Sequence, residues 1–373
     1  MTVLAVLSLL IWIYLLGARG HFWQAGPVLV PDRPAVSPPV VAVVPARDEA
    51  DLISRSVGSL LAQTYAGPFR VILVDDNSRD GTGDAARGLS DPRLTVLTGT
   101  PRPPGWSGKL WAVAQGIEAG TVGAPVFFLL TDADIVHRPE HVATLVAQAE
   151  RGNLDMVSEM VALSCETVAE RALIPAFVFF FQLLYPFGWV NEPRRPTAAA
   201  AGGTILIRHR ALARIGGIAA IRGVLIDDVA LANAVKRDGR IWLGHSMLAR
   251  SIRIYPGLAD IWRMIARSAY VQLHFSPLLL AGCTIAMLLT WIVPPVAAIV
   301  GHGAAQVIGA VTLAALAWSY LPTLRRFGLS EFWAPVLPLI ALFYIAATIG
   351  SAINHHLGRG VAWKGRAYQD AGA

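Results

Sequence analysis

Two aspartates separated by one residue follow an apolar run near the middle of the chain. The run is Phe127–Thr131, and Asp132 and Asp134 come directly after it. An apolar run that stops at acids is typical of a buried parallel strand that ends at the ligand-binding edge of an α/β sheet. Carboxylates at that edge suit Mg²⁺ or Mn²⁺, whose remaining ligands are often substrate phosphates. Two carboxylates at this spacing occur in many loops by chance. The prediction of a divalent metal at Asp132 and Asp134 therefore depends on their position directly after a strand.

Three more charged clusters lie at predicted strand ends or helix starts. They are Arg47-Asp48-Glu49, Asp75-Asp76 and Asp227-Asp228. Aspartates at helix amino termini also cap backbone amides, and capping alone would account for any one cluster. It does not readily account for all of them in this order, so the sequence favours a shared ligand site.

The elements that must position these acids alternate between strand and helix. This alternation predicts parallel strands with right-handed crossovers in one α/β domain. The strands are expected at 40–44, 71–74, 94–97, 127–131, 156–161 and 204–207, and the helices at 52–61, 82–89, 109–117, 139–150 and from 227 onward. A small-residue run, Ala198–Gly203, precedes the last strand and indicates close approach of a ligand or backbone.

A glycine- and proline-rich loop, residues 101–108, leads to Lys109 at the start of a helix. The loop does not fit the phosphate-loop motif, because Pro103 stands where the first glycine belongs and Leu110 where Ser or Thr belongs. A lysine beside a diphosphate and a solvated lysine therefore both remain open.

The composition is too apolar for an ordinary soluble enzyme, with 54% hydrophobic and 15% charged residues and a mean hydropathy of +0.52. Four segments approach the roughly 20 residues that cross a hydrocarbon core, the first a little short. They are 2–16, 277–293, 304–321 and 332–353. The net charge of +6 comes largely from arginine, but no basic stretch is interleaved with aromatics, so we expect lipid headgroups and a diphosphate, and no nucleic acid, as partners.

A further apolar stretch, residues 172–189, lies inside the α/β block. As a membrane span it would put the two halves of the sheet on opposite sides, so an interfacial helix is the better interpretation. Arg19 follows the first apolar segment and favours a cytoplasmic position for what comes next. The predicted organisation is therefore an anchor at 1–20, a cytoplasmic domain at 21–275, about three transmembrane helices at 276–355 and a tail at 356–373. Four spans would put this basic tail outside, against the positive-inside rule, unless one later segment is re-entrant.

Taken together, these clusters resemble the family 2 glycosyltransferases, with a GT-A nucleotide-binding fold. The resemblance rests on Val44–Glu49, Val74–Thr82, Asp132-Ala133-Asp134 and Asp227-Asp228, and covers residues of about 40 to 275. More narrowly, the chain resembles the hopanoid-biosynthesis-associated membrane glycosyltransferases of bacteria. This narrower resemblance rests on the N-terminal anchor and on Trp106–Lys109, Phe177–Asn191, Ala198–Gly203 and Trp363–Arg366. Two departures matter: Asp227 replaces the usual Glu, and the Gln-x-x-Arg-Trp signature of processive polymerising members is absent.

The resemblance implies a GT-A Rossmann-like domain with a mostly parallel sheet and transmembrane helices at both ends, in the bacterial inner membrane. It implies an inverting enzyme that moves a sugar from a nucleotide diphosphate sugar, expected to be a UDP-sugar, to a lipid acceptor such as a hopanoid or another polyprenoid. A ceramide, a diacylglycerol or undecaprenyl phosphate as the acceptor would fit the residues equally well. Asp228 would be the catalytic base and Asp134, with Asp132, would bind the metal. The implied donor-binding residues are Pro45, Arg47, Glu49, Asp76, Lys109 and Asp132, and those toward the acceptor are Asp227, Gly203 and Trp189.

Three alternatives stay open. A processive polysaccharide synthase needs a channel lined by polar groups, whereas the last three apolar segments carry almost none. A polyprenyl-phosphate glycosyltransferase would fit the same residues. A membrane scaffold without turnover would not need all four charged clusters.

Overall fold

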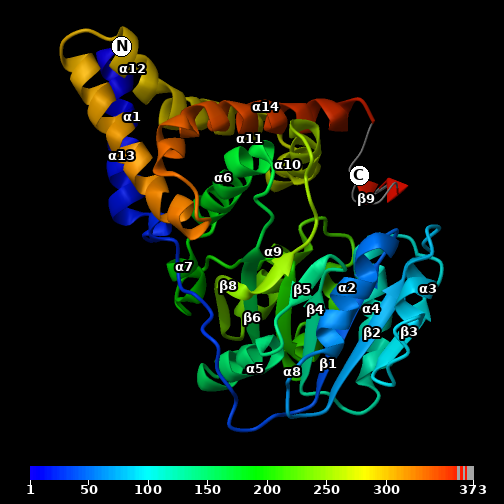
Figure 1. Cartoon of the computed structure of the whole chain (residues 1–373). Helices are drawn as coiled ribbons and strands as arrows, with labels where there is room; N and C mark the ends of the chain where they lie inside the picture. The colour runs from blue at the N-terminus through cyan, green and yellow to red at the C-terminus, as the bar shows by residue number, and fades with distance from the viewer. Residues whose placement is uncertain (359–361, 364–365, 368–373) are drawn as a thin grey trace. The chain divides into compact units, whose positions relative to one another are not determined.

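The computed structural model describes residues 1–358, 362–363 and 366–367, so most of the predicted tail, including Arg359 and Lys364, lies outside the described residues. The chain forms two compact units. A helical unit contains residues 1–26, 165–188 and 254–358, and an α/β unit contains residues 27–164 and 189–253. The two units are drawn in Figure 1.

The α/β unit contains the strands and helices that the periodicity predicted, together with several that it missed. Its strands are β1 (Val40–Ala46), β2 (Phe69–Asp75), β3 (Leu94–Thr98), β4 (Phe127–Thr131), β5 (Ile135–His137), β6 (Met156–Ala162), β7 (Thr204–Arg208) and β8 (Ile241–Ser251). Its helices are α2 (Ala50–Leu61), α3 (Thr82–Arg87), α4 (Gly108–Thr121), α5 (His141–Arg151), α8 (His209–Arg214), η2 (Ile218–Ile221) and α9 (Asp227–Lys236). The short pair β9 (Ala362–Trp363) and β10 (Arg366–Ala367) follows near the end of the chain.

One mixed sheet holds all eight strands of the α/β unit, in the order β3-β2-β1-β4-β7-β6-β8-β5. Strands β3, β2, β1 and β4 are parallel neighbours, whereas β7 runs antiparallel to both β4 and β6. This is the GT-A-like α/β fold that the sequence predicts, with a sheet that is mixed rather than uniformly parallel. The strands β5 and β8, which the sequence analysis missed, close one end of the sheet as an antiparallel pair.

The centre of the sheet is apolar on both faces. All residues of β1 and of β4 are buried, as expected for strands covered by helices on both sides. The core around them is made largely of valine, leucine and alanine side chains, most of them from β1, β2, β4, α2 and α5. Because these strands are fully enclosed, the polar residues that follow them can only emerge at the sheet edge.

Helix α4 lies very close to the sheet because glycine faces it. A Cβ added at Gly116 would stand 2.4 Å from Cγ1 of Val43, closer than packed side chains approach. This close packing fixes the direction of the helix that begins next to Lys109.

We expect Gly116→Ala to destabilise the α/β unit by about 1–3 kcal/mol, the usual cost of overpacking, because the branched Val43 side chain cannot move aside cheaply. The matched control is Gly58→Ala in α2, where nothing lies within 4 Å of the added methyl group and the helix gains about 0.5–1 kcal/mol. The midpoint of thermal unfolding in detergent measures both changes. An unfolding midpoint for Gly116→Ala at or above that of the wild type would contradict this account of the packing.

The helical unit is built from apolar helices around an aromatic core. Its elements are α1 (Thr2–Ala18), η1 (Phe22–Gln24), α6 (Val168–Leu184), α10 (Leu258–Gln272), α11 (Pro277–Met287), the π-helix η3 (Leu288–Ile292), α12 (Val293–Val300), α13 (Ala304–Arg326), η4 (Glu331–Val336) and α14 (Leu337–His356). The predicted helix at 172–189 is instead divided between α6 and α7 (Phe187–Asn191), with the break at Tyr185-Pro186. Proline has no N–H to continue the helix and disfavours a helical residue before it.

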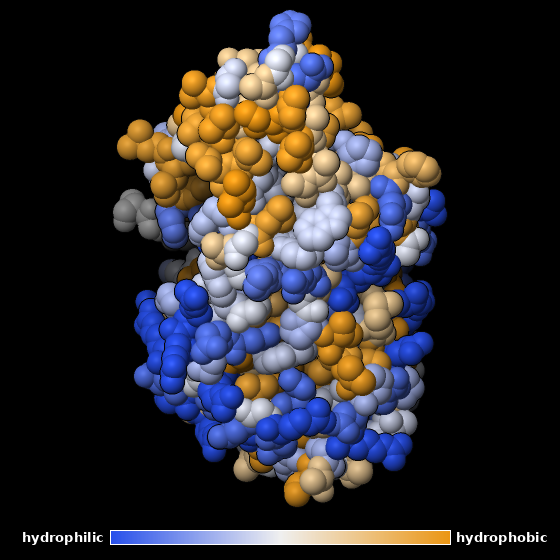
Figure 2. Space-filling view, turned by 90° about the vertical axis from the view of Figure 1, so that its left-hand side faces the viewer, coloured by the Kyte–Doolittle hydropathy of each residue, from blue (hydrophilic) through white to orange (hydrophobic). Residues whose placement is uncertain are grey.

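Three stretches of this unit are long and apolar enough to cross a membrane: Pro277–Val300, Ala304–Arg326 and Glu331–His356. The N-terminal helix α1 is apolar but shorter. Figure 2 shows apolar surface gathered over the helical unit, while hydrophilic residues cover most of the α/β unit. These findings indicate membrane association of the helical unit.

Candidate active site

The loops that follow β1, β2 and β4 meet at one edge of the sheet. Strand β1 lies between β2 and β4, parallel to both, so the carboxyl ends of the three strands point the same way. Ala46 stands opposite Asp75, and Asp132 follows the last residue of β4. Open α/β sheets bind ligands at this edge.

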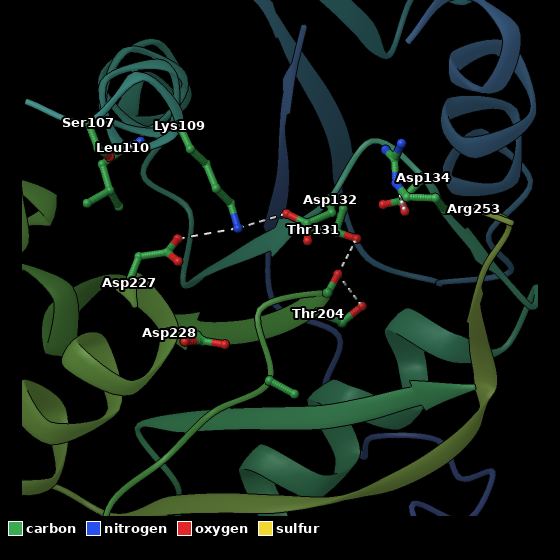
Figure 3. Close-up of polar contacts among 12 residues, drawn as sticks. Ser107, Lys109, Leu110, Thr131, Asp132, Asp134, Thr204, Asp227, Asp228 and Arg253 are labelled. Atoms are coloured by element: carbon green, nitrogen blue, oxygen red, sulfur yellow. Dashed lines mark hydrogen bonds and ion pairs between the residues drawn. The ribbon is translucent and has the colours of Figure 1, made fainter. Parts of the chain in front are cut away.

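Lys109 is the central cation of the site. Its helix α4 begins after Ser107, whose hydroxyl caps the backbone N–H of Leu110. The Lys109 Nζ lies 2.9 Å from Oδ1 of Asp132 and 3.3 Å from Oδ2 of Asp227, so the lysine bridges β4 and α9 (Figure 3). Burial alone would lower the pKa of Lys109, but the carboxylates of Asp132 and Asp227 raise it, so the ammonium stays charged. Of the two interpretations of Lys109, the structure therefore excludes the solvated one.

Asp228 lies beside this ion pair, at the start of α9. Its Oδ1 accepts a hydrogen bond from the backbone N–H of Val229 at 2.8 Å. Burial and the neighbouring charge of Asp227 raise the pKa of Asp228 to about 7. A carboxylate with a pKa near neutrality can exchange a proton at the pH of the cell, which is what a general base requires.

A cleft that is open to solvent joins these groups; its empty space, including the open solvent at its mouth, is about 380 Å³. Its polar lining is Lys109, Thr131, Asp132, Asp227 and Asp228. Pro45 from the end of β1 lines it too, and so does Gly202. A concave site with an apolar wall and a few convergent charged groups is the usual form of a small-molecule site.

A second ion-pair cluster involves Arg253, a residue that the sequence analysis did not identify. Its Nε donates to Oδ2 of Asp134 at 2.9 Å, and its Nη2 to Oε1 of Glu49 at 2.5 Å. Ser251 also donates to Asp134, at 3.1 Å. Arg253 reaches this place because β8 pairs with β5, directly after Asp134. The sequence held no signal for that contact, since neither strand was predicted.

The carboxylates fit a hard divalent cation by the chemistry of their donors. Asp132 and Asp134 offer only oxygen, and among the described residues no group of three or more His, Cys, Asp and Glu side chains could hold a metal by itself. Mg²⁺ and Mn²⁺ are commonly bound by one or two carboxylates, with phosphates completing the shell. Burial raises the pKa of Asp132, while the charge of Lys109 acts to lower it.

Of the remaining predicted site residues, Gly203 lies near the central acids, whereas Arg47, Asp76 and Trp189 do not line the cavity. Arg47 donates from Nη1 to the backbone oxygen of Asp76 at 2.6 Å and lies 3.5 Å from its buried carboxylate, so these two form one structural pair outside the cavity lining. Gly203 lies within reach of the central acids, because its carbonyl accepts from the N–H of Asp132 at 3.2 Å. Trp189 is packed under Arg195, with 5.3 Å between guanidinium and ring, and does not line the cavity.

Comparison with known proteins identifies the type of domain. Residues 41–216, just under half of the chain, match the family model described as Glycosyl transferase family 2. The O-antigen biosynthesis protein RfbC of Myxococcus xanthus is 28% identical over 215 residues; the match covers 54% of this chain but only 16% of that protein.

Among solved structures, the mannosyltransferase PcManGT from Pyrobaculum calidifontis, in complex with GDP-Man and Mn²⁺, superposes with a TM-score of 0.53 at 19% identity. The match covers 93% of this chain and 98% of that one. At this identity the likeness shows the fold alone. A glucosyl-3-phosphoglycerate synthase from Mycobacterium tuberculosis, with Mn²⁺, UDP and phosphoglyceric acid, matches 66% of this chain with a TM-score of 0.41 at 16% identity and 78% coverage of that chain.

Proposed function

Starting from the glycosyltransferase family 2 domain that residues 41–216 carry, we propose that the protein is a membrane-bound inverting glycosyltransferase that moves a sugar from a nucleotide diphosphate to a lipid. The observation that carries the proposal is the convergence of Lys109, Asp132 and Asp228 in one cavity. This set contains a cation for a leaving phosphate, a metal-binding carboxylate and a base of suitable pKa.

The donor would bind with its diphosphate between Lys109 and the acids after β4. A divalent cation held by Asp134 and Asp132 would stabilise the negative charge of the leaving diphosphate. Lys109 contributes a second positive charge at the same place, already oriented by Asp132 and Asp227. Pro45, Arg47, Glu49 and Asp76 are proposed to contact the nucleotide, with UDP as the nucleotide; parallel assays with UDP- and GDP-sugars would test that choice.

Asp228 would act on the acceptor. Its carboxylate removes the proton from the acceptor hydroxyl, whose oxygen forms a bond to the anomeric carbon while the bond from that carbon to the diphosphate oxygen breaks. Attack from the face opposite the leaving group inverts the anomeric configuration in a single displacement. One carboxylate is enough for this step, unlike the pair that a hydrolase uses.

The pKa of Asp228 predicts a pH profile with a definite sign. The base must be unprotonated, so kcat/KM should fall about tenfold per pH unit below pH 7 and level off above it. The matched variant is Asp227→Asn, which removes the neighbouring charge that helps to raise this pKa and should move the midpoint of the profile to lower pH. A profile without a break between pH 6 and 8 in the wild type would contradict the assignment of Asp228 as the base.

The acceptor is proposed to be a hopanoid or another polyprenoid alcohol. The support is the helical unit, with three stretches long and apolar enough to enter a bilayer, in the same chain as a glycosyltransferase domain. Mass spectrometry of total lipids from cells with and without the gene is the decisive experiment. We expect one glycolipid to disappear with the gene, and an unchanged lipid profile together with a lost polysaccharide would favour a polymer synthase instead.

The proposed location is the inner membrane of a bacterium, with the catalytic domain in the cytoplasm, where nucleotide sugars are made. Ser90 in the α/β unit and His302 between α12 and α13 are both exposed. In a variant without Cys165 and Cys283, a single cysteine at position 90 should be protected from an impermeant thiol reagent in intact cells, and one at position 302 should react. External labelling at position 90 would overturn this topology.

A further inference from the structure

Four polar side chains form a continuous chain inside the α/β unit, behind the cavity. They are Glu159 in β6, His141 at the start of α5, His137 in β5 and Thr131 at the end of β4. The residues are nearly or completely buried, with exposures of 0%, 0%, 4% and 2%. Only Thr131 reaches the cavity, so the other three play no part in the chemistry proposed above.

The contacts run in one line from Glu159 to the active-site edge. Oε1 of Glu159 lies 2.6 Å from Nε2 of His141. The two atoms are in close ion-pair contact, but their arrangement does not meet the geometric criteria of a hydrogen bond. The two imidazoles stack, with Nδ1 of His141 2.8 Å from Nδ1 of His137. Nε2 of His137 then lies 3.2 Å from the hydroxyl of Thr131.

The direction of each hydrogen bond follows from the far end of the chain. The Thr131 hydroxyl donates its one proton to the carbonyl of Gly203 at 2.9 Å, so it must accept from Nε2–H of His137. Burial and the nearby His141 lower the pKa of His137, so its ring is neutral and its Nδ1 accepts from His141. His141 then donates from its Nδ1, and its Nε2 faces Oε1 of Glu159 at 2.6 Å.

The end of this chain fixes the backbone around the site. The Gly203 carbonyl accepts from the Thr131 hydroxyl, from the Thr204 hydroxyl at 2.8 Å and from the N–H of Asp132 at 3.2 Å. The adjacent Gly202 lies against Asp228, since an added Cβ there would stand 3.2 Å from Oδ2 of that acid. A shift of this turn would therefore change the spacing between Asp132 and Asp228.

Stability alone does not account for such an arrangement. Buried charged and polar groups must recover the cost of leaving water, and well-packed apolar replacements are often equally stable. The polar chain does give directional bonds, which an apolar core cannot.

We propose that Glu159, His141 and His137 are positioning residues that orient the Thr131 hydroxyl toward Gly203 and so hold Asp132 and Asp228 at their working separation. This inference rests on the proposed glycosyltransferase function. It predicts that breaking the chain harms catalysis and metal-dependent nucleotide binding without a matching loss of stability.

The test compares two substitutions of His137 in the full chain in detergent. His137→Leu removes the donor to Thr131, whereas His137→Gln retains an N–H near the position of Nε2. We expect His137→Leu to lose about 10- to 100-fold in kcat and in affinity for UDP or GDP with Mn²⁺, the affinity being measured by calorimetry. A loss of this size is typical when a residue that supports a metal ligand is replaced. His137→Gln should stay close to the wild type. The unfolding midpoints of both variants without nucleotide show whether the loss of binding in His137→Leu exceeds its loss of stability.

Two outcomes would overturn the inference. One is equal behaviour of the Leu and Gln variants; the other is a loss of binding that simply follows a lower unfolding midpoint. If His137→Leu does not fold, Thr131→Val removes the same hydroxyl bond with a side chain of equal size and should show the same loss. If the wild type binds neither nucleotide with Mn²⁺, the proposed function itself fails. If the wild type binds nucleotide and the variants bind it equally well, only the present inference fails.

Discussion

Replacing Asp228 with Asn is expected to abolish sugar transfer while leaving nucleotide binding nearly intact. The amide has the shape of the carboxylic acid but cannot accept the proton of the acceptor, and general-base catalysis typically contributes about a hundred- to ten-thousand-fold. Nucleotide binding should persist because the diphosphate is proposed to bind to Lys109 and to the acids after β4, not to Asp228. Turnover with a lipid extract as acceptor and calorimetry with the nucleotide measure the two quantities separately.

Two variants serve as controls for this result. Asp238→Asn changes an exposed acid just beyond the other end of α9 and should leave turnover unchanged. Asp227→Glu keeps a carboxylate within reach of Lys109, 3.3 Å away in the structure, and should be tolerated. Full turnover in Asp228→Asn, or loss of nucleotide binding in that variant, would mean that the base is another residue.

Removing divalent metal is expected to have an effect of similar size. Transfer in washed membranes should vanish in EDTA and return with Mg²⁺ or Mn²⁺, because the acids after β4 present only hard oxygen ligands at the place where the diphosphate would lie. In Asp134→Asn the metal concentration needed for half-maximal activity should rise by at least about 10- to 100-fold, which is the loss seen when a residue that only supports a metal ligand is replaced.

Arg253 makes the metal experiment more informative. It occupies one oxygen of Asp134 at 2.9 Å, so the cation must compete with it or use the other oxygen. Asp84→Asn is the matched control, since that exposed acid pairs with the exposed Arg87 at 2.9 Å and should not change the metal requirement. Undiminished transfer in EDTA would exclude Asp132 and Asp134 as metal ligands.

The sequence by itself determined the elements whose burial is complete. The apolar runs 40–44, 71–74 and 127–131 were predictable because strand segments covered on both faces must be apolar, and the acids that follow them must then lie at one edge. The same reasoning located Lys109 at a helix start and Asp227-Asp228 at another. Local patterns were sufficient here because each rule depends on neighbouring residues only.

The tertiary structure decided which of these residues meet. Strand β7 returns antiparallel to β4, and this reversal sets the carbonyl of Gly203 against the N–H of Asp132. The pairing of β5 with β8 brings Arg253 to Asp134 across 119 positions of the chain. Neither pairing leaves a trace in local periodicity, because strand direction and partner are selected by the packing of the whole sheet.

The buried chain from Glu159 to Thr131 shows the same limit. A histidine or a glutamate in an apolar stretch predicts nothing by itself, since each needs a partner whose identity depends on the fold. In this protein His137 and His141 are neighbours across one turn of chain, but Glu159 comes from β6 and the Thr131 hydroxyl from β4. The sequence therefore determined the chemical groups at the edge of the sheet, while only the tertiary structure determined their distances, because those distances are set by contacts between residues far apart in the chain.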